Sequence, residues 1–246
     1  MIKKLMIVCV LGFFACACQS IPDTPENFEA VTVETEHFSF RIFQKQITPG
    51  KPVRFYIEGN GNPNPDNFVA LKMAQNDPSQ NVIYLSRPCQ FIDSRACSNA
   101  AIYTTAQFHE EILGEMQELT AYLINKYKVP AVEFVGYDGG ATIAMLLGTR
   151  VPQTRRIITV AGILDLNSYT AHNELKPFND SLNPADERNI IAAIPQIHYV
   201  GGKDEITTKR MAERFVARLQ SPRSAVVKVV PSLGHDGWER VQFDYY

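Results

Sequence analysis

The chain has 246 residues, of which 45% are hydrophobic and 20% are charged. This balance is typical of a folded globular protein and too apolar for a disordered one. Lys and Arg number 24 against 26 Asp and Glu, a net charge of −2 without any basic run, which argues against a nucleic-acid partner. The one long apolar stretch lies at the N-terminus and is too short to span a membrane. Multi-span membrane proteins, coiled coils, collagens and disulfide-dense toxins are excluded.

The N-terminal segment has the pattern of an export signal. Lys3 and Lys4 precede an apolar run over residues 5–14, and small residues follow it. A charged start, a short apolar core and small residues before a cleavage site define a secretory signal peptide. The sequence therefore predicts a signal peptide over residues 1–17.

The expected cleavage site resembles a bacterial lipobox, in which a small residue precedes a Cys that becomes lipidated. Cys18 fits this pattern best because Ala17 stands directly before it, and Cys16 is the alternative. The resemblance implies a lipoprotein that faces the periplasm. Gln19 rather than Asp at the second mature position favours the outer membrane, so the expected membrane contact is an N-terminal lipid.

The remaining cysteines predict a disulfide. Of the five Cys, cleavage before Cys18 removes two and lipidation uses a third, which leaves Cys89 and Cys97. In an oxidising compartment an even pair is expected to form a bond, and the chain-entropy relation gives it roughly 2–3 kcal/mol. No second Cys or His pair stands at ligand spacing, so no metal site is expected.

Strand-like and helix-like patterns alternate along the rest of the chain. Residues 18–30 are expected to form a polar tether, followed by one domain over residues 31–246. The hydrophobic patterns predict strands at 30–33, 38–43, 53–57, 82–85, 132–135, 157–160, 197–200 and 225–230, and helices at 67–74, 105–126, 141–149, 207–219 and from about 237. The first two strands are expected to form an antiparallel hairpin. Such alternation predicts an α/β fold with a mostly parallel sheet and helices on both faces.

A candidate nucleophile position follows the strand predicted at 132–135. The segment Gly136-Tyr137-Asp138-Gly139-Gly140 leads directly into a helix of small residues. This is the strand, turn and helix context of a nucleophile elbow, in which the central residue sits in a strained turn. The flanking glycines are needed because neighbouring backbone passes too close for side chains.

Two further candidates follow the next strands, where the working residues of an open α/β sheet lie. Asp204 comes after the strand at 197–200, and His235 comes after the strand at 225–230. The order of Asp138, Asp204 and His235 is that of an α/β-hydrolase triad. We expect Asp204 to orient His235 through its second ring nitrogen, with Asp165 as the alternative acid.

The loop after the strand at 53–57 occupies the place of an oxyanion loop. Backbone N–H groups near Asn60 and Gly139 are expected to form the oxyanion hole. Glu58, at the start of this loop, is expected to be a structural carboxylate that accepts loop N–H bonds rather than a catalytic group. His198 lies within a strand and is not expected to act.

These motifs resemble the α/β-hydrolase superfamily and, more narrowly, a group of uncharacterised proteobacterial lipoproteins. The resemblance covers about residues 51–238. Its shared segments are Tyr56-Ile57-Glu58-Gly59-x-Gly61, Arg87-Pro88-Cys89-Gln90 with Cys97, Gly136-Tyr137-x-Gly139-Gly140, Val160-Ala161-Gly162, Ser181-Leu182-Asn183-Pro184, Pro195-Gln196-x-His198 and Gly237-Trp238-Glu239. It implies an eight-stranded α/β-hydrolase fold with a short cap segment, and it does not specify a substrate.

One residue departs from the group's pattern. The group has Ser inside this elbow, whereas this chain has Asp138. Haloalkane dehalogenases and epoxide hydrolases place a nucleophilic Asp here, but they commonly have an aromatic residue or Arg where this chain has Gly139. A second carboxylate beside His235 also favours the imidazolium and weakens it as a base.

The expected function is therefore that of a hydrolase acting on a small ester-like substrate through an atypical site. The alternatives are a non-catalytic binding lipoprotein with the same fold and a hydrolase of epoxide or haloalkane type with Asp138 as nucleophile. No cofactor is expected, and the sequence leaves the oligomeric state open.

Overall fold

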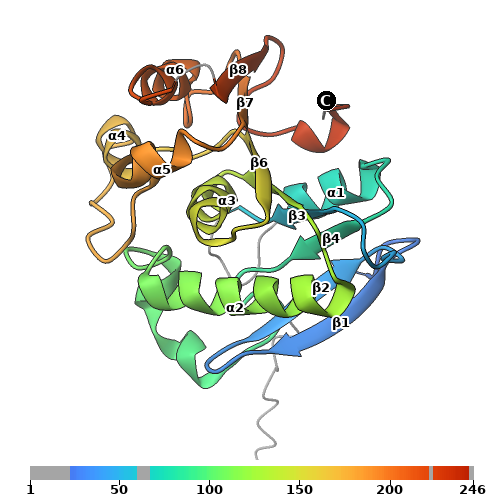
Figure 1. The fold of residues 1–246 in the computed structure, drawn as a ribbon. Helices are drawn as coiled ribbons and strands as arrows, with labels where there is room; N and C mark the ends of the chain where they lie inside the picture. The colour runs from blue at the N-terminus through green and yellow to red at the C-terminus, as the bar shows by residue number, and fades with distance from the viewer. Residues whose placement is uncertain (1–22, 60–66, 222–223, 244–246) are drawn as a thin grey trace, which may run out of the picture.

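A twisted sheet of eight strands forms the centre of the molecule in the computed structural model, which describes residues 23–59, 67–221 and 224–243 (Figure 1). The spatial order is β1-β2-β4-β3-β5-β6-β7-β8. The strands are β1 (Glu29–Glu34), β2 (Ser39–Gln44), β3 (Val53–Ile57), β4 (Val82–Leu85), β5 (Val132–Tyr137), β6 (Thr154–Val160), β7 (Gln196–Gly201) and β8 (Ala225–Val230).

The strand predictions are confirmed, with ends that shift by a few residues at most. β1 and β2 form the expected antiparallel hairpin, β2 runs antiparallel to β4, and all other neighbouring strands are parallel. β1 begins at Glu29, which pairs with Gln44, so the sheet starts inside the segment expected as a tether. The central strands β3, β4 and β5 are buried along their whole length because helices cover both faces.

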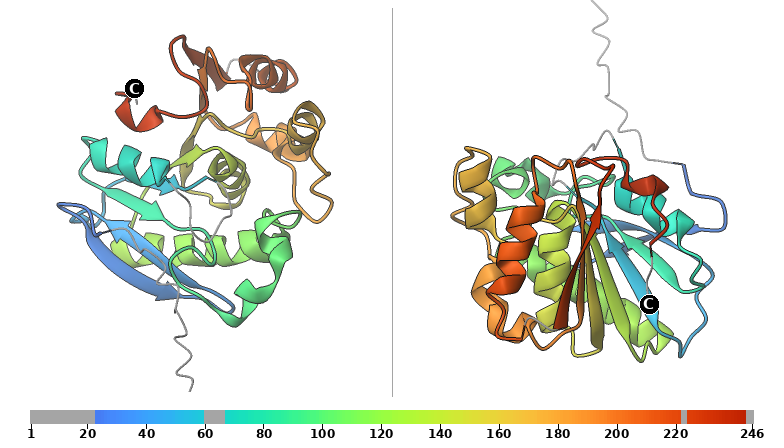
Figure 2. Two further views of the ribbon diagram at one scale, coloured as in Figure 1. Left: turned by 180° about the vertical axis from the view of Figure 1, so that it is seen from behind. Right: turned by 90° about the horizontal axis from the view of Figure 1, so that it is seen from above.

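Helices flank the sheet on its two sides (Figure 2). They are α1 (Val69–Asn76), α2 (Glu110–Tyr127), α3 (Gly139–Arg150), α4 (Leu166–His172), α5 (Arg188–Ile191) and α6 (Lys209–Ala217). Side chains of α2, α3 and α6 share one hydrophobic cluster with the sheet, whereas α1 and the fully buried Trp238 belong to a second cluster on the other face. None of these helices, within the described part of the chain, is long and apolar enough to cross a membrane.

Two helix predictions need correction. The helix expected from residue 105 begins at Glu110, because the His109 ring accepts the Glu111 N–H at 3.3 Å and caps the helix there. The chain before it forms two 3₁₀ turns, η1 (Arg95–Ser98) and η2 (Ala100–Tyr103). The helix expected from about residue 237 is only the short 3₁₀ turn η5 (Trp238–Arg240).

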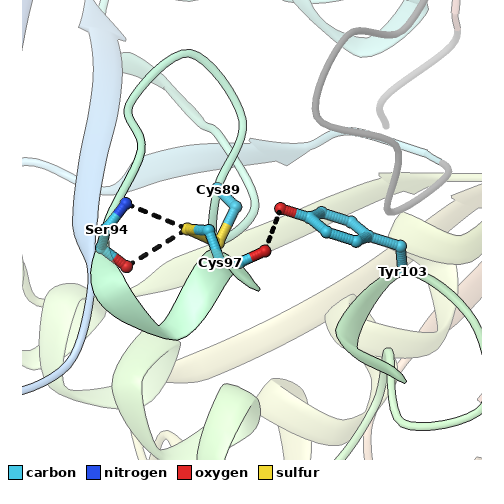
Figure 3. The surroundings of a disulfide bond; sticks show 4 residues. All are labelled: Cys89, Ser94, Cys97 and Tyr103. Carbon is cyan, nitrogen blue, oxygen red and sulfur yellow. Dashed lines mark hydrogen bonds between the residues drawn. A yellow bond between two sulfur atoms is a disulfide. The ribbon is translucent and has the colours of Figure 1, made fainter. Parts of the chain in front are cut away.

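Cys89 and Cys97 form the predicted disulfide in the loop after β4 (Figure 3). The Ser94 N–H lies 3.2 Å from the Cys97 sulfur, and the Tyr103 hydroxyl donates to the Cys97 carbonyl at 3.4 Å. The bridge therefore joins the end of β4 to the 3₁₀ turns that lead towards α2.

The segment between β6 and β7 forms the short cap that the resemblance implied. It consists of α4, the 3₁₀ turn η3 (Pro184–Glu187) and α5. Asp165, the alternative acid, begins this cap: its Oδ1 atom accepts the Asn167 N–H at 3.1 Å and the Asn183 side-chain amide at 3.0 Å. Asp165 is therefore a helix-capping residue.

Candidate active site

Asp138 lies in a sharp turn between β5 and α3. Its backbone angles, φ 48° and ψ −118°, are strongly unfavourable for a residue with a side chain. The turn is fixed from both sides: the Asp138 N–H donates to the Val160 carbonyl at 3.0 Å, and the Asp138 carbonyl accepts the Ile163 N–H at 3.1 Å. This is the conformation that the elbow motif predicted.

The glycines around Asp138 are required by close backbone contacts, as the sequence predicted. A Cβ atom on Gly136 would come within 2.2 Å of the Gly140 carbonyl oxygen. A Cβ atom on Gly140 would come within 2.3 Å of the Ile57 carbonyl oxygen. The elbow therefore packs directly against the carboxyl end of β3, where the expected oxyanion loop begins.

That loop is in place as far as the structure describes it. A Cβ atom on Gly59 would lie 2.8 Å from the Tyr137 ring and 3.1 Å from the Asp138 Cβ, so the loop begins against the elbow. Asn60, the expected oxyanion residue of this loop, lies outside the described residues. Gly139, the other one, is the first residue of α3, where the helix provides no carbonyl partner for the N–H group.

Glu58 has the structural role that the sequence predicted. Its Oε1 atom accepts the N–H groups of Gly59 at 3.1 Å and Ala70 at 3.2 Å. Burial raises the pKa of this carboxyl group to about 7, although these backbone hydrogen bonds oppose the change. Glu58 thus ties the loop after β3 to the start of α1.

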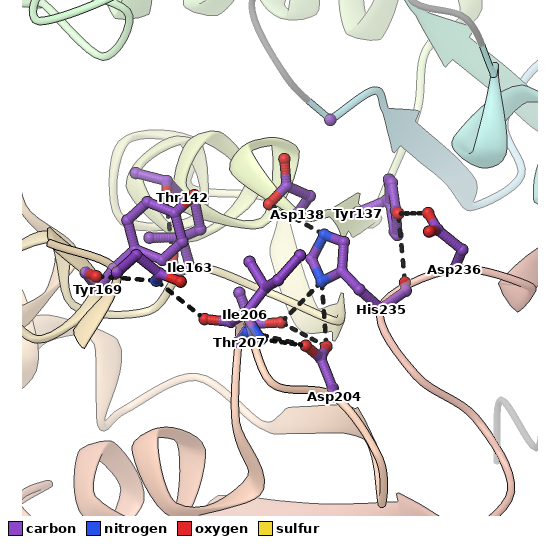
Figure 4. A network of polar contacts seen from close by, with 12 residues as sticks. Tyr137, Asp138, Thr142, Ile163, Tyr169, Asp204, Ile206, Thr207, His235 and Asp236 are labelled. Carbon is purple, nitrogen blue, oxygen red and sulfur yellow. Dashed lines mark hydrogen bonds and ion pairs between the residues drawn. The ribbon is translucent and has the colours of Figure 1, made fainter. Parts of the chain in front are cut away.

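The structure brings Asp138, His235 and Asp204 together (Figure 4). The His235 Nε2 atom lies 3.5 Å from Asp138 Oδ1, and its Nδ1 atom lies 3.1 Å from Asp204 Oδ2. The side chains of His235 and Asp138 are each 15% exposed, whereas that of Asp204 is fully buried. The imidazole is therefore held between two carboxylates, and Asp204 occupies the position expected for the orienting acid.

Asp204 is fixed by the turn that leads into α6. Its Oδ1 atom accepts the N–H groups of Ile206 and Thr207, each at 2.9 Å, and the Thr207 hydroxyl donates to Oδ2 at 2.7 Å. The Thr207 Oγ1 atom also lies 3.3 Å from His235 Nδ1. Sequence reasoning missed Thr207. Its position three residues after Asp204, at the start of the helix predicted over 207–219, was the available signal.

Burial and the two carboxylates have opposite effects on the pKa of His235. Burial disfavours the imidazolium and lowers the pKa, but the hydrogen bonds and charges of Asp138 and Asp204 outweigh it and raise the pKa to about 10. The pKa of Asp204 is lowered: burial raises it, but the bonds from His235 and Thr207 prevail. At neutral pH, His235 is therefore an imidazolium.

Two tyrosines that the sequence did not single out also line the site. The Tyr137 hydroxyl donates to the His235 carbonyl at 3.3 Å and lies 3.3 Å from an Asp236 carboxylate oxygen, which fixes the loop that carries the histidine. Tyr169 comes from α4 in the cap. Burial, together with the charges of Asp138 and Asp204, raises its pKa to about 12. The cap therefore lies close enough to form one wall of the site.

Arg87, directly after β4, lies on the other side of the elbow. It is only 1% exposed. Its Nη2 atom donates to the Gln107 carbonyl at 2.6 Å, and the guanidinium lies 5.1 Å from the centre of the Phe108 ring. Burial lowers its pKa to about 10, opposed by the charges of Asp138 and Glu58. The sequence pattern predicted no role for Arg87, although this residue lies in one of the segments that carry the resemblance.

The other candidates do not join this group. His198 is fully buried in β7, where its Nδ1 atom lies 2.8 Å from the Thr159 hydroxyl, and burial lowers its pKa to about 4. Within residues 23–59, 67–221 and 224–243, no cluster of three or more His, Cys, Asp or Glu side chains is arranged to hold a metal ion.

Several esterases are among the solved structures with a similar fold. The fold is similar to that of the esterase Pf2001 of Pyrococcus furiosus, with a TM-score of 0.64 and 14% identity over 85% of this chain and 83% of that one. It is similar to the carboxylesterase CesB of Bacillus subtilis, with a TM-score of 0.59 and 13% identity over 86% of each chain. Est1E of Butyrivibrio proteoclasticus gives a TM-score of 0.63 and 11% identity over 84% of this chain and 90% of that one.

No protein-family model and no curated protein sequence matches the chain. The strand order, the strained elbow and the structural neighbours together show that it has the α/β-hydrolase fold. At these identities the likeness describes the fold alone, so the chemistry has to be argued from the site.

Proposed function

We propose that the protein is a lipid-anchored, periplasm-facing hydrolase that acts on a small ester-like substrate through Asp138, His235 and Asp204. The observation that carries the proposal is the imidazole of His235, which lies between the strained elbow carboxylate and a buried, fully hydrogen-bonded acid. Strain of this kind persists where surrounding structure enforces it, and it concentrates at functional sites. The names of the structural neighbours, an esterase and a carboxylesterase, support an ester as the substrate class.

Asp138 is better suited to activate water than to attack an ester itself. Attack by a carboxylate on an ester carbonyl would form an anhydride, which is as reactive as the substrate or more so. In the route that we propose, the Asp138 carboxylate removes a proton from a water molecule while the water oxygen bonds to the carbonyl carbon. The carbonyl electrons move to the oxygen, which becomes the oxyanion.

His235 then acts as the general acid. When the oxyanion collapses and the bond to the leaving alcohol breaks, the imidazolium donates its Nε2 proton to the leaving oxygen. The proton held by Asp138 afterwards passes to Nε2, which lies 3.5 Å from Oδ1, and the starting state is restored. An imidazolium with a pKa of about 10 is suited to this order of events because it is still protonated when the leaving group departs.

The decisive experiment is a single turnover of p-nitrophenyl acetate in water enriched in ¹⁸O, followed by mass spectrometry of the acetate and of the peptide that contains Asp138. Label in the acetate and none in the peptide is the expected result. Label in Asp138 would overturn the general-base route in favour of a covalent intermediate. The Asp138→Asn variant is expected to lose activity, whereas Glu110→Gln, which changes an exposed carboxylate outside the site, should keep it.

Two other outcomes would replace the ester proposal. A stable adduct on Asp138 after incubation with an epoxide or an alkyl halide would assign the protein to the enzymes that attack saturated carbon. Absence of turnover with short esters, thioesters, epoxides and halides, in a folded protein, would assign it to the non-catalytic binding lipoproteins.

The membrane anchor is supported by the N-terminal signal and by the disulfide. Cys18 lies outside the described residues, but Cys89 and Cys97 form a disulfide bond, which is typical of proteins in an oxidising compartment. The test is detergent phase partitioning of Cys18→Ala expressed in a bacterium, with Cys16→Ala as the matched control. Loss of the detergent-phase form in the first variant alone is expected; partitioning of Cys18→Ala like the unmodified protein would refute lipidation at Cys18.

A further inference from the structure

Arg87 presents a buried positive charge that the described structure does not neutralise by an ion pair. Its Nη2 and Nη1 atoms donate to the carbonyl and the side-chain oxygen of Gln107, at 2.6 and 3.3 Å, and both acceptors are uncharged. The Nε atom is buried and has no hydrogen-bond partner in the described part of the chain. Among the described residues, no carboxylate lies within ion-pair distance of Arg87. Such a group is costly unless a negative charge is supplied nearby.

The guanidinium lies next to the first residue of α3. A Cβ atom on Gly139 would come within 3.3 Å of Arg87 Nη1 and within 3.3 Å of the Phe108 ring. The lack of a side chain at Gly139 therefore leaves room for the charged end of Arg87.

The charges around the elbow balance only while Asp138 is ionised. The carboxylates of Asp138 and Asp204 oppose the imidazolium of His235 and the guanidinium of Arg87, and Glu58 has a pKa raised to about 7 by burial. When Asp138 accepts the proton of the attacking water, its negative charge disappears and the carbonyl oxygen gains one. A fixed positive charge beside Gly139 then stabilises that oxygen, because the buried guanidinium is already in place and requires no reorganisation.

We propose that Arg87 is a catalytic residue that stabilises the oxyanion together with the Gly139 N–H group. The inference rests on the proposed ester hydrolysis at the same site. It assigns a chemical role to the Arg87-Pro88-Cys89-Gln90 segment, which the Cys89–Cys97 disulfide joins to the chain before α2.

Steady-state hydrolysis of p-nitrophenyl acetate tests the role. Arg87→Met is expected to lower kcat by about 10²–10³-fold with KM changed by only a few fold, as for loss of an oxyanion donor. Arg87→Lys keeps the charge but not its position, so its kcat should lie between those of Arg87→Met and the unmodified protein. Arg150→Met, which removes a surface arginine paired with Glu110, is the control and should match the unmodified protein. A folded Arg87→Met protein with kcat within threefold of the unmodified one would overturn the proposal.

A second measurement does not depend on turnover. Asp138→Asn removes the charge that balances Arg87, so this variant should bind formate at the elbow, seen as a saturable shift of the Gly139 amide signal in NMR spectra. The double variant Asp138→Asn with Arg87→Lys should bind formate more weakly, and the one with Arg87→Met should not bind it. Equal responses in all three proteins would overturn the inference even if esters are hydrolysed. Formate binding that needs Arg87, in a protein without esterase activity, would instead refute the proposed function alone and leave an anion site.

Discussion

The pKa of His235 is the quantity on which the proposed chemistry depends, and the Asp138→Asn variant tests it directly. The amide keeps the shape of the carboxyl group and removes the charge that lies 3.5 Å from Nε2. The change from an ordinary value of 6.5 to about 10 corresponds to about 5 kcal/mol in favour of the imidazolium. Burial alone would lower the pKa of His235, so the carboxylates of Asp138 and Asp204 together cause the increase.

Loss of one carboxylate should lower the pKa of His235 by about 1–3 pH units, the range that a single opposite charge confers at this distance. The assay is an NMR titration of the imidazole Cε1–H signal between pH 5 and 10.5, with His235→Gln to assign the signal. Glu110→Gln is the control, because this exposed carboxylate pairs with Arg150 outside the site, and the pKa of His235 should not change.

The reasoning has a clear point of failure. If His235 titrates near 6.5 in the unmodified protein, or if Asp138→Asn leaves its pKa unchanged, Asp138 does not hold the imidazole in its charged form, and the proposed order of proton transfers is wrong. The same ion pairs predict that folded-state stability from the imidazolium is fully present below pH 6.5. It should be lost as the pH rises to about 10, because the folded-state pKa is raised.

Three further predictions concern the elbow and its supports. Replacing Cys89 and Cys97 together by Ser should lower the free energy of unfolding by about 2–3 kcal/mol, measured by urea denaturation; an unchanged midpoint would contradict it. Burial raises the pKa of Glu58 to about 7, so the protonated carboxyl group stabilises the folded state at low pH. The free energy of unfolding should therefore fall by about 3 kcal/mol between pH 4.5 and 7 because of this group, and Glu58→Gln should remove that fall. Parallel stability–pH profiles of the variant and the unmodified protein would contradict this prediction. Asp138→Ser should hydrolyse an activated ester faster than the unmodified chain and should react with a phosphonate probe. Adding His235→Ala should abolish both effects. A Ser variant that folds but is inert would show that the elbow geometry does not support acyl transfer.

Most of the fold could be predicted from the sequence because its strands are short apolar runs bounded by turn residues. Those over 53–57, 82–85 and 225–230 have the predicted bounds. The errors fall where local pattern competes with capping or packing. Residues 105–109 continue the helical pattern of α2, but the ring of His109 ends the helix at Glu110. Residues after Gly237 form a single 3₁₀ turn around the fully buried Trp238.

The candidate site could be predicted only as far as chain order places residues at one edge of the sheet. Asp138, Asp204 and His235 each follow a strand, and the structure brings their side chains together. Thr207 and Arg87 were missed for different reasons. Thr207 acts through a hydrogen bond to an acid three residues away, which is a local pattern. Arg87 reaches the elbow across the sheet from β4, and no spacing along the chain encodes that contact.

An Asp at the elbow changes what the other groups of the site are able to do. With a neutral hydroxyl at that position, a histidine beside one buried acid can act as a base, because a single carboxylate supports its charged form only during the reaction. With Asp138 present, the second carboxylate keeps the imidazole charged from the start, so the elbow residue acts as the base and His235 acts as the acid. Hydrolysis then needs a positive charge that remains when Asp138 is neutralised. Arg87 is the buried guanidinium beside Gly139, and its charge is the one that this exchange of roles requires.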